Sequence, residues 1–130
     1  MSSSAQPVDL AALFAALADP TRLRLLNLIA GREVCVCHLV EILDQGQPKI
    51  SRHLAYLRKA GVVTARREGK WMHYRLCPPA DEAVASILTA TLSALDGNQQ
   101  MRGERNKLER VCEPMININL VTGSGKAKTA

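Results

Sequence analysis

The sequence predicts a mainly helical domain that carries one small β-hairpin. Its 130 residues suit a single domain rather than two. Apolar residues recur at helical spacing over most of the chain, whereas aromatic residues, which favour strands, make up only 3%. Two short strand-like runs, 62–67 and 71–76, flank the loop Glu68-Gly69-Lys70 and predict the hairpin.

Two helices separated by a capping motif are predicted near the N-terminal end. A helix over 9–18 is indicated by an apolar stripe at i, i+3, i+4 and i+7, formed by Leu10, Leu13, Phe14 and Leu17. Asp19 suits the N-cap of a second helix over 20–30, and Pro20 suits its first position. Gly31 suits the residue that follows that helix.

A helix-turn-helix motif is predicted between residues 34 and 60. The third helix covers 34–43, a turn that contains Gly46 covers 44–46, and the fourth helix covers 47–60. Two helices joined by so short a turn are typical of a DNA-binding motif. With the hairpin beside it as a wing, the motif predicts a winged helix-turn-helix fold.

The C-terminal third holds a further strong helix and then weaker signals. A fifth helix over 80–95 follows the break at Pro78-Pro79, and a weak sixth helix, marred by Gly103, is expected over 100–111. We expect a flexible tail over 113–130. The chain is therefore divided into an N-terminal tail over 1–8, a DNA-binding and dimerisation domain over 9–96, and a C-terminal extension over 97–130.

The first and fifth helices each present an apolar face that so small a core cannot cover. A second copy of the chain would bury both faces, so we expect a homodimer through these two helices. Two-fold symmetry would place the recognition helices about 34 Å apart, which is one turn of DNA.

The charge of the chain is concentrated in one segment. The net charge is +5, but residues 49–75 hold eight Lys and Arg against Glu68 alone, so this segment is +7 and the remainder −2. A basic segment in an otherwise near-neutral protein indicates contact with a polyanion. On charge alone, a solvated surface is an equal alternative.

The polar face of the fourth helix has the composition of a helix that reads a major groove. Ile50, Leu54 and Leu57 share the core face. Arg suits guanine, Gln suits adenine and Ser suits either base, which favours base reading over an ordinary solvated face. The candidate DNA contacts on this helix are Gln47, Lys49, Ser51, Arg52, Tyr56 and Lys59, and those in the hairpin are Arg66, Arg67 and Lys70.

Cys35 and Cys37 are candidate ligands for a soft ion. Two residues apart on an ideal helix, their side chains diverge by about 200°, so joint binding should distort the start of the third helix. A helix N-terminus also lowers a thiol pKa and favours the thiolate. The alternative is that both cysteines are small buried apolar residues.

No apolar run approaches the length of a membrane span, and residues 1–7 lack the features of a secretory signal. We therefore expect a cytoplasmic protein without a membrane partner. Its four cysteines, Cys35, Cys37, Cys77 and Cys112, should then be reduced thiols.

Three segments in order resemble the ArsR/SmtB family of metal-responsive repressors, most of all its arsenic-responsive branch. Residues 16–26 resemble the opening signature of the family, residues 33–39 its metal-box motif and residues 47–54 its recognition helix. The resemblance covers about residues 9–95. It implies a winged-helix homodimer, not an enzyme, that represses a metalloid-resistance operon and leaves the operator when its inducer binds.

The resemblance and the sulfur ligands together imply trivalent arsenic or antimony as the inducer, with no organic cofactor. Two departures matter: Val40 stands where some relatives carry a third cysteine, and His38 where many carry Asp. The third ligand is therefore open, with Cys112 from either subunit as one candidate and a small thiol or water as another. Cys77 is expected to be structural.

Several rival functions stay open. A repressor of the same fold could sense oxidants or sulfur species through the same thiols, and a cadmium or lead sensor is a further alternative. An enzyme such as a thiol-based metalloid reductase is disfavoured, because neither cysteine of the pair lies on a Gly-rich anion-binding loop. A constitutive architectural DNA-binding protein would ignore every inducer.

Overall fold

The computed structural model describes the backbone of residues 9–124 and the side chains of residues 9–112. The expected tail over 1–8, and residues 125–130, lie outside this part. The elements follow in the order α1 (Leu10–Leu17), α2 (Pro20–Ile29), β1 (Val34–Cys35), α3 (Val36–Leu43), α4 (Gln47–Lys59), β2 (Val63–Glu68), β3 (Trp71–Leu76), α5 (Glu82–Asp96) and α6 (Gln99–Ser124).

The capping predictions for the first two helices are confirmed. The Asp9 carboxylate accepts a hydrogen bond from the backbone N–H of Ala11 at the start of α1. The Asp19 carboxylate accepts one from the backbone N–H of Arg22, 3.0 Å away, and Pro20 opens α2. These side chains satisfy donors that a helix N-terminus would otherwise leave unpaired.

The third helix begins two residues later than the sequence predicts. Val34 and Cys35 are not helical but form β1, which pairs antiparallel with β3 to give a sheet of order β1-β3-β2. Val34 is 1% exposed and packs in the core, and β3 supplies partners for its backbone. The expectation of a helix over 34–43 is therefore wrong at its start, because a partner strand distant in sequence holds Val34 and Cys35 extended.

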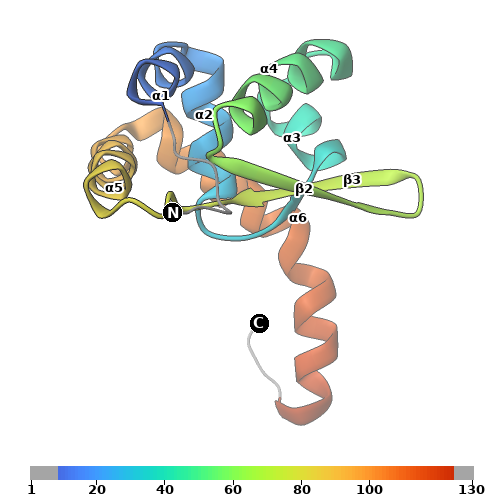
Figure 1. Cartoon of the computed structure of the whole chain (residues 1–130). Helices are drawn as coiled ribbons and strands as arrows, with labels where there is room; N and C mark the ends of the chain where they lie inside the picture. Colours follow the sequence, from blue (N-terminus) through green and yellow to red (C-terminus); the bar gives the residue numbers. More distant parts are fainter. Residues whose placement is uncertain (1–8, 125–130) are drawn as a thin grey trace.

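The predicted helix-turn-helix and hairpin are both present. Asp44 ends α3 in the left-handed conformation, with φ of 56°, which an Asp tolerates better than most residues. Figure 1 shows α1 and α5 at one end of the molecule, α3 and α4 at the other, and the β2–β3 hairpin reaching outward. The buried face of α4 is the predicted one: Ile50, Leu54 and Leu57.

The C-terminal helix is longer than predicted. The expected weak helix over 100–111 is a continuous helix, α6, to Ser124, so the expected tail over 113–130 is wrong for residues 113–124. Gly103 lowers the helix propensity of α6 but does not interrupt it, because contacts with α2 and α3 hold the helix on both sides of this residue. None of the helices in the described part of the chain combines the length and apolar character needed to cross a membrane.

Helix α6 is anchored to α2 by buried polar groups. The Arg24 guanidinium donates hydrogen bonds to both carboxylate oxygens of Glu104, including Nε to Oε2 at 3.0 Å. The buried Asn27 amide donates to the Met101 carbonyl oxygen at 2.9 Å. Leu108 lies in the same core as the helix-turn-helix. These contacts join the C-terminal extension to the winged helix-turn-helix.

Glu104→Ala should lower the free energy of unfolding by about 3 kcal/mol, because it leaves the Arg24 guanidinium without its buried partner. The Glu104 side chain is only 8% exposed, whereas Asp96 of α5, which pairs with Arg105 of the same helix α6, is 63% exposed. Asp96→Ala is therefore the matched control and should change stability little. Urea unfolding measures both variants, and equal losses would contradict the anchoring role of Glu104.

Candidate DNA-binding surface and thiol site

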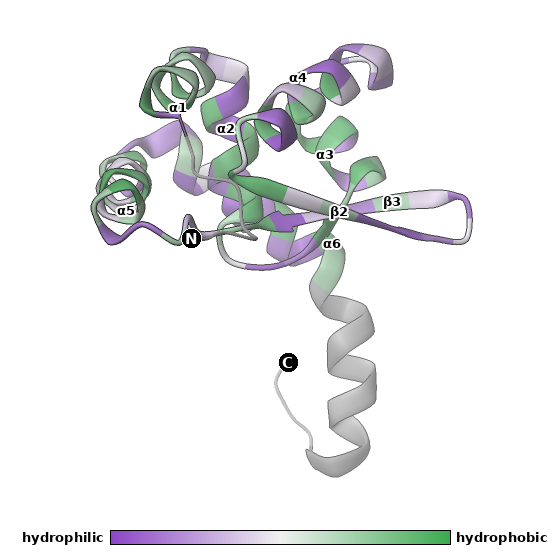
Figure 2. Cartoon of the chain, viewed as in Figure 1, coloured by the Kyte–Doolittle hydropathy of each residue, from purple (hydrophilic) through white to green (hydrophobic). Residues whose placement is uncertain are grey.

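Helix α4 presents most of its predicted DNA contacts to solvent. Its outward side chains are exposed at Gln47, Lys49, Arg52, Tyr56 and Lys59, and Ser51 is partly buried. Figure 2 shows hydrophilic residues on α4 and at the far end of the hairpin, away from the apolar α1 and α5. This face has the shape and polarity for docking a helix in a major groove.

Tyr56 takes part in a contact that the sequence did not reveal. The Arg22 guanidinium lies 4.0 Å from the centre of the Tyr56 ring, a cation–π arrangement. Arg22 also donates hydrogen bonds to the carbonyl oxygens of Ala15 and Ala16, at 3.0 and 2.8 Å. It therefore joins the end of α1 to α4, and Tyr56 helps position α4.

His53 completes this cluster from α4. Arginine can only donate, so the His53 Nδ1, 3.2 Å from the Arg22 Nη1, must accept. Burial lowers the pKa of His53, and the Arg22, Lys49 and Arg52 charges add to this against the opposing effect of Asp19. The contacts of Arg22 could have been suspected from the sequence. A positive charge in the first turn of a helix is unfavourable next to the helix dipole, so an arginine there suggests that its side chain makes a specific contact.

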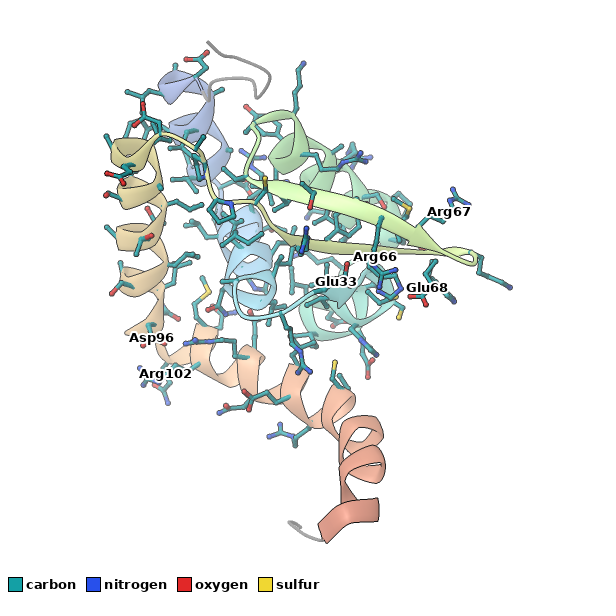
Figure 3. The ribbon with its side chains drawn as sticks, turned by 60° about the horizontal axis from the view of Figure 1, so that its bottom comes forward. Glu33, Arg66, Arg67, Glu68, Asp96 and Arg102 are labelled. Carbon is teal, nitrogen blue, oxygen red and sulfur yellow. The ribbon has the colours of Figure 1, made fainter. Side chains whose placement is uncertain are left out.

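The two arginines of the wing point in different directions. Arg66 donates two hydrogen bonds to the Glu33 carboxylate, at 2.7 and 2.9 Å, and lies 3.3 Å from Glu68. The hydrogen bonds from Arg66 lower the pKa of Glu33. Figure 3 shows Arg66 turned toward Glu33 and Arg67 pointing away from both. Arg66 is thus held by two carboxylates, whereas Arg67 and Lys70 at the hairpin turn are exposed to solvent.

Cys35 and Cys37 meet without any distortion of a helix. Cys35 is the N-cap of α3, with an extended backbone at ψ of 142°, and its sulfur accepts a hydrogen bond from the Cys37 N–H at 3.4 Å. The two sulfurs are 2.9 Å apart. The expectation that the side chains diverge by about 200° is therefore wrong, because only Cys37 lies inside the helix.

The expected fall in thiol pKa is also wrong for Cys37. Burial, followed by the hydrogen bond and charge of the neighbouring Cys35, raises the pKa of Cys37 to about 11. Backbone N–H groups at the start of α3 lower it, but by less. A metal ion that binds here must therefore displace a thiol proton, which couples binding to proton release.

Cys112 lies near the pair but does not complete a cluster. Its sulfur is 3.7 Å from the His38 Nδ1, and His38 follows Cys37 directly. Among the side chains of residues 9–112, no three His, Cys, Asp or Glu are gathered closely enough to hold a metal ion. Cys77 lies elsewhere, after β3, where its N–H donates to the Val62 carbonyl.

Comparison with known proteins places this geometry in a family. Residues 19–65 match the model of the arsR family of bacterial regulatory proteins. The arsenical resistance operon repressor of Escherichia coli (strain K12) is 52% identical over 108 residues, which are 82% of this chain and 85% of that one. The arsenic resistance transcriptional regulator ArsR1 of Pseudomonas putida is 47% identical over 89 residues, 68% of this chain and 67% of that one.

A solved structure agrees with the fold. The solution structure of the homodimeric winged helix-turn-helix domain Mb0332 from Mycobacterium bovis aligns with a TM-score of 0.56 at 32% identity, over 67% of this chain and 78% of that one. The matched proteins are regulators of transcription rather than enzymes. The chain belongs to the ArsR family of DNA-binding transcriptional regulators.

Proposed function

We propose that this repressor controls a metalloid-resistance operon and that trivalent arsenic or antimony releases it from operator DNA. The observation that carries the proposal is the Cys35–Cys37 pair, whose sulfurs lie 2.9 Å apart where β1 meets α3. Thiolate ligands select soft ions. Relatives named for arsenical and arsenic resistance, at 52% and 47% identity, support the same class of inducer.

Cys35 and Cys37 supply two of the ligands, and Cys112 supplies the third. At a metal–sulfur bond of about 2.3 Å and bond angles of roughly 90–110°, two sulfurs on one ion lie about 3.3–3.8 Å apart, so the pair at 2.9 Å would need to open slightly to bind. Cys112 is held beside His38 by the anchored helix α6, within the subunit. It must move toward the pair when an ion binds, because the three sulfurs are not gathered beforehand.

The position of Cys35 explains how binding reaches DNA. Its sulfur caps α3, so drawing that sulfur into a bond with an ion removes the acceptor of the Cys37 N–H. Helix α3 packs directly on the recognition helix α4. A shift at the start of α3 therefore moves α4, the helix that reads the operator. The protein acts in the cytoplasm, where its thiols stay reduced and able to bind an ion.

The protein acts as a homodimer through α1 and α5. Leu10 and Phe14 on α1 are 47% and 52% exposed and, four residues apart, lie on the same face of the helix, where they form an exposed apolar surface. Figure 2 shows apolar residues on α1 and α5 at the same end of the molecule. The similar domain from Mycobacterium bovis is a homodimer, which supports pairing of this face with a second copy.

A redox-sensing repressor is the second candidate. The 2.9 Å approach of the Cys35 and Cys37 sulfurs also suits a disulfide, formed when an oxidant takes two electrons and two protons leave the thiols. Release of DNA by a peroxide in the absence of metal would favour this function over metalloid sensing. Cadmium and lead salts belong in the same titration as soft-ion alternatives.

Arg52→Ala should weaken operator binding by about 1–3 kcal/mol and relax the base preference, because Arg52 reads a base from α4. Arg67→Ala should weaken binding to all sequences alike and reduce the salt slope by about one, because Arg67 contacts a phosphate. Arg102→Ala, on the opposite corner of the molecule, is the control (Figure 3). Fluorescence anisotropy measures all three, and unchanged specific binding by Arg52→Ala would refute its role.

Phe14→Glu should convert the dimer to monomer, because a charge would be buried unpaired in the interface. The exposed Phe14 can be changed without disturbing the core, whereas Leu88 is 2% exposed and a change there would test folding. Trp71→Glu removes another exposed aromatic, in the wing, and should leave the dimer intact. Sedimentation velocity at micromolar concentration decides: a dimeric Phe14→Glu protein excludes α1 from the interface.

Cys35→Ser and Cys37→Ser should each bind operator DNA like the unmodified chain but resist release by arsenite. The unmodified chain should lose about 5- to 150-fold in affinity when arsenite binds. Cys77→Ser is the matched control and should respond normally. Cys112→Ser tests the third ligand, and its normal release would remove Cys112 from the site. Normal release of both pair variants would disprove sensing by these thiols.

A further inference from the structure

Four charged or ionisable side chains form a chain of contacts on one face of the sheet, which we call the wing latch: Glu33, Arg66, Glu68 and His73. Arg66 links two carboxylates, with 2.7 Å to Glu33 and 3.3 Å to Glu68. Glu68 in turn lies 3.5 Å from the His73 Nε2. Figure 3 shows Glu33, Arg66 and Glu68 close to one another along the outer half of the hairpin, toward its turn.

The strand register places a sensing thiol in the same row as the wing latch. Cys35 of β1 lies opposite His73 of β3, and His73 lies opposite Arg66 of β2. Residues directly opposite in antiparallel strands project from the same face, so Cys35, His73 and Arg66 form one row across the three strands. The latch therefore begins two residues before Cys35, at Glu33, and ends in the wing.

The Glu33–Arg66 pair adds a side-chain link between the segment before β1 and the wing, beside the backbone pairing of β1 with β3. Glu33 and Arg66 line an open cleft of about 660 Å³ between the loop after α2 and the two strands of the hairpin. The Glu33–Arg66 pair crosses this cleft. Its side chains are 30% and 52% exposed, and exposed ion pairs add little to stability. Its two hydrogen bonds instead fix the orientation of the Arg66 side chain relative to Glu33, since a bidentate arginine–carboxylate pair forms only in a narrow range of geometries.

We propose that Glu33 is a positioning residue that couples the thiol pair to the wing by holding Arg66. This inference rests on the proposed function. Glu33 and Cys35 lie on the same short segment, so movement of Cys35 toward a bound ion carries Glu33 with it. Arg66 and the hairpin follow through the two hydrogen bonds, which turns Arg67 and Lys70 away from the phosphates.

Trp71 offers a direct readout of the wing. It is the only tryptophan in the chain, and it lies opposite Glu68 at the start of β3. Arsenite added without DNA should change Trp71 fluorescence in the unmodified chain. Glu33→Gln removes the charge that holds Arg66 and should abolish this change while arsenite still binds. Thiol protection against alkylation measures arsenite binding independently of the wing.

The DNA measurement uses a charge-matched set of variants. Glu33→Gln and Arg66→Gln should each reduce the arsenite-dependent change in operator Kd by roughly 2- to 30-fold. The reversed pair Glu33→Arg/Arg66→Glu keeps the net charge and should restore much of the response. Glu109→Gln makes the same charge change as Glu33→Gln at an exposed site on α6 and should respond like the unmodified chain.

The outcomes separate the two proposals. If the unmodified chain neither binds arsenite nor leaves DNA, the proposed function fails. If it does both, and Glu33→Gln matches it in Trp71 fluorescence and in DNA release, the coupling role of Glu33 is overturned. Loss of the fluorescence change and of release in Glu33→Gln, with arsenite still bound and rescue by the reversed pair, establishes the latch.

Discussion

The pairing of Val34 with Tyr74 and of Cys35 with His73 fixes the relation between the wing and the helix-turn-helix. Because Cys35 is held in the sheet, α3 can begin only at Val36, and the Cys35 sulfur falls at its N-cap. The same constraint brings the two sulfurs together and aligns Cys35 with Arg66 across the strands. The thiol pair, the wing and the helix-turn-helix thus all adjoin one two-residue strand.

The helices that the sequence predicts well are those with local signals. Asp19 and Pro20 correctly predict where α2 begins. The spacing of apolar residues in α4 correctly predicts which of its faces is buried. Strand β1 has no such signal, because two residues show no periodicity and their partners lie about forty positions later. Because the sequence predicts that α3 begins two residues too early, Cys35 is placed inside the helix and its side chain is expected to diverge from that of Cys37. The position of one helix end thus determines the predicted geometry of the thiol pair.

The remaining misses also depend on contacts between distant segments. Helix α6 has a weak local signal, but Arg24 and Asn27, more than 70 positions earlier, supply the partners that hold it. Counting charge over 49–75 treats Arg66 and Arg67 alike. The carboxylates that distinguish them could be found only in three dimensions, where Glu33 reaches Arg66.

The burial of the thiol pair has a kinetic consequence. Cys35 is only 9% exposed and Cys37 is partly buried, so a species arriving from solvent meets Cys37 first. With a pKa near 11, that first sulfur is almost always protonated at neutral pH. Bulky thiol reagents are therefore kept out by shape and small ones are captured slowly. For an ion bound in the proposed way, the time needed to respond would be governed by entry and deprotonation, separately from how tightly the ion is finally held.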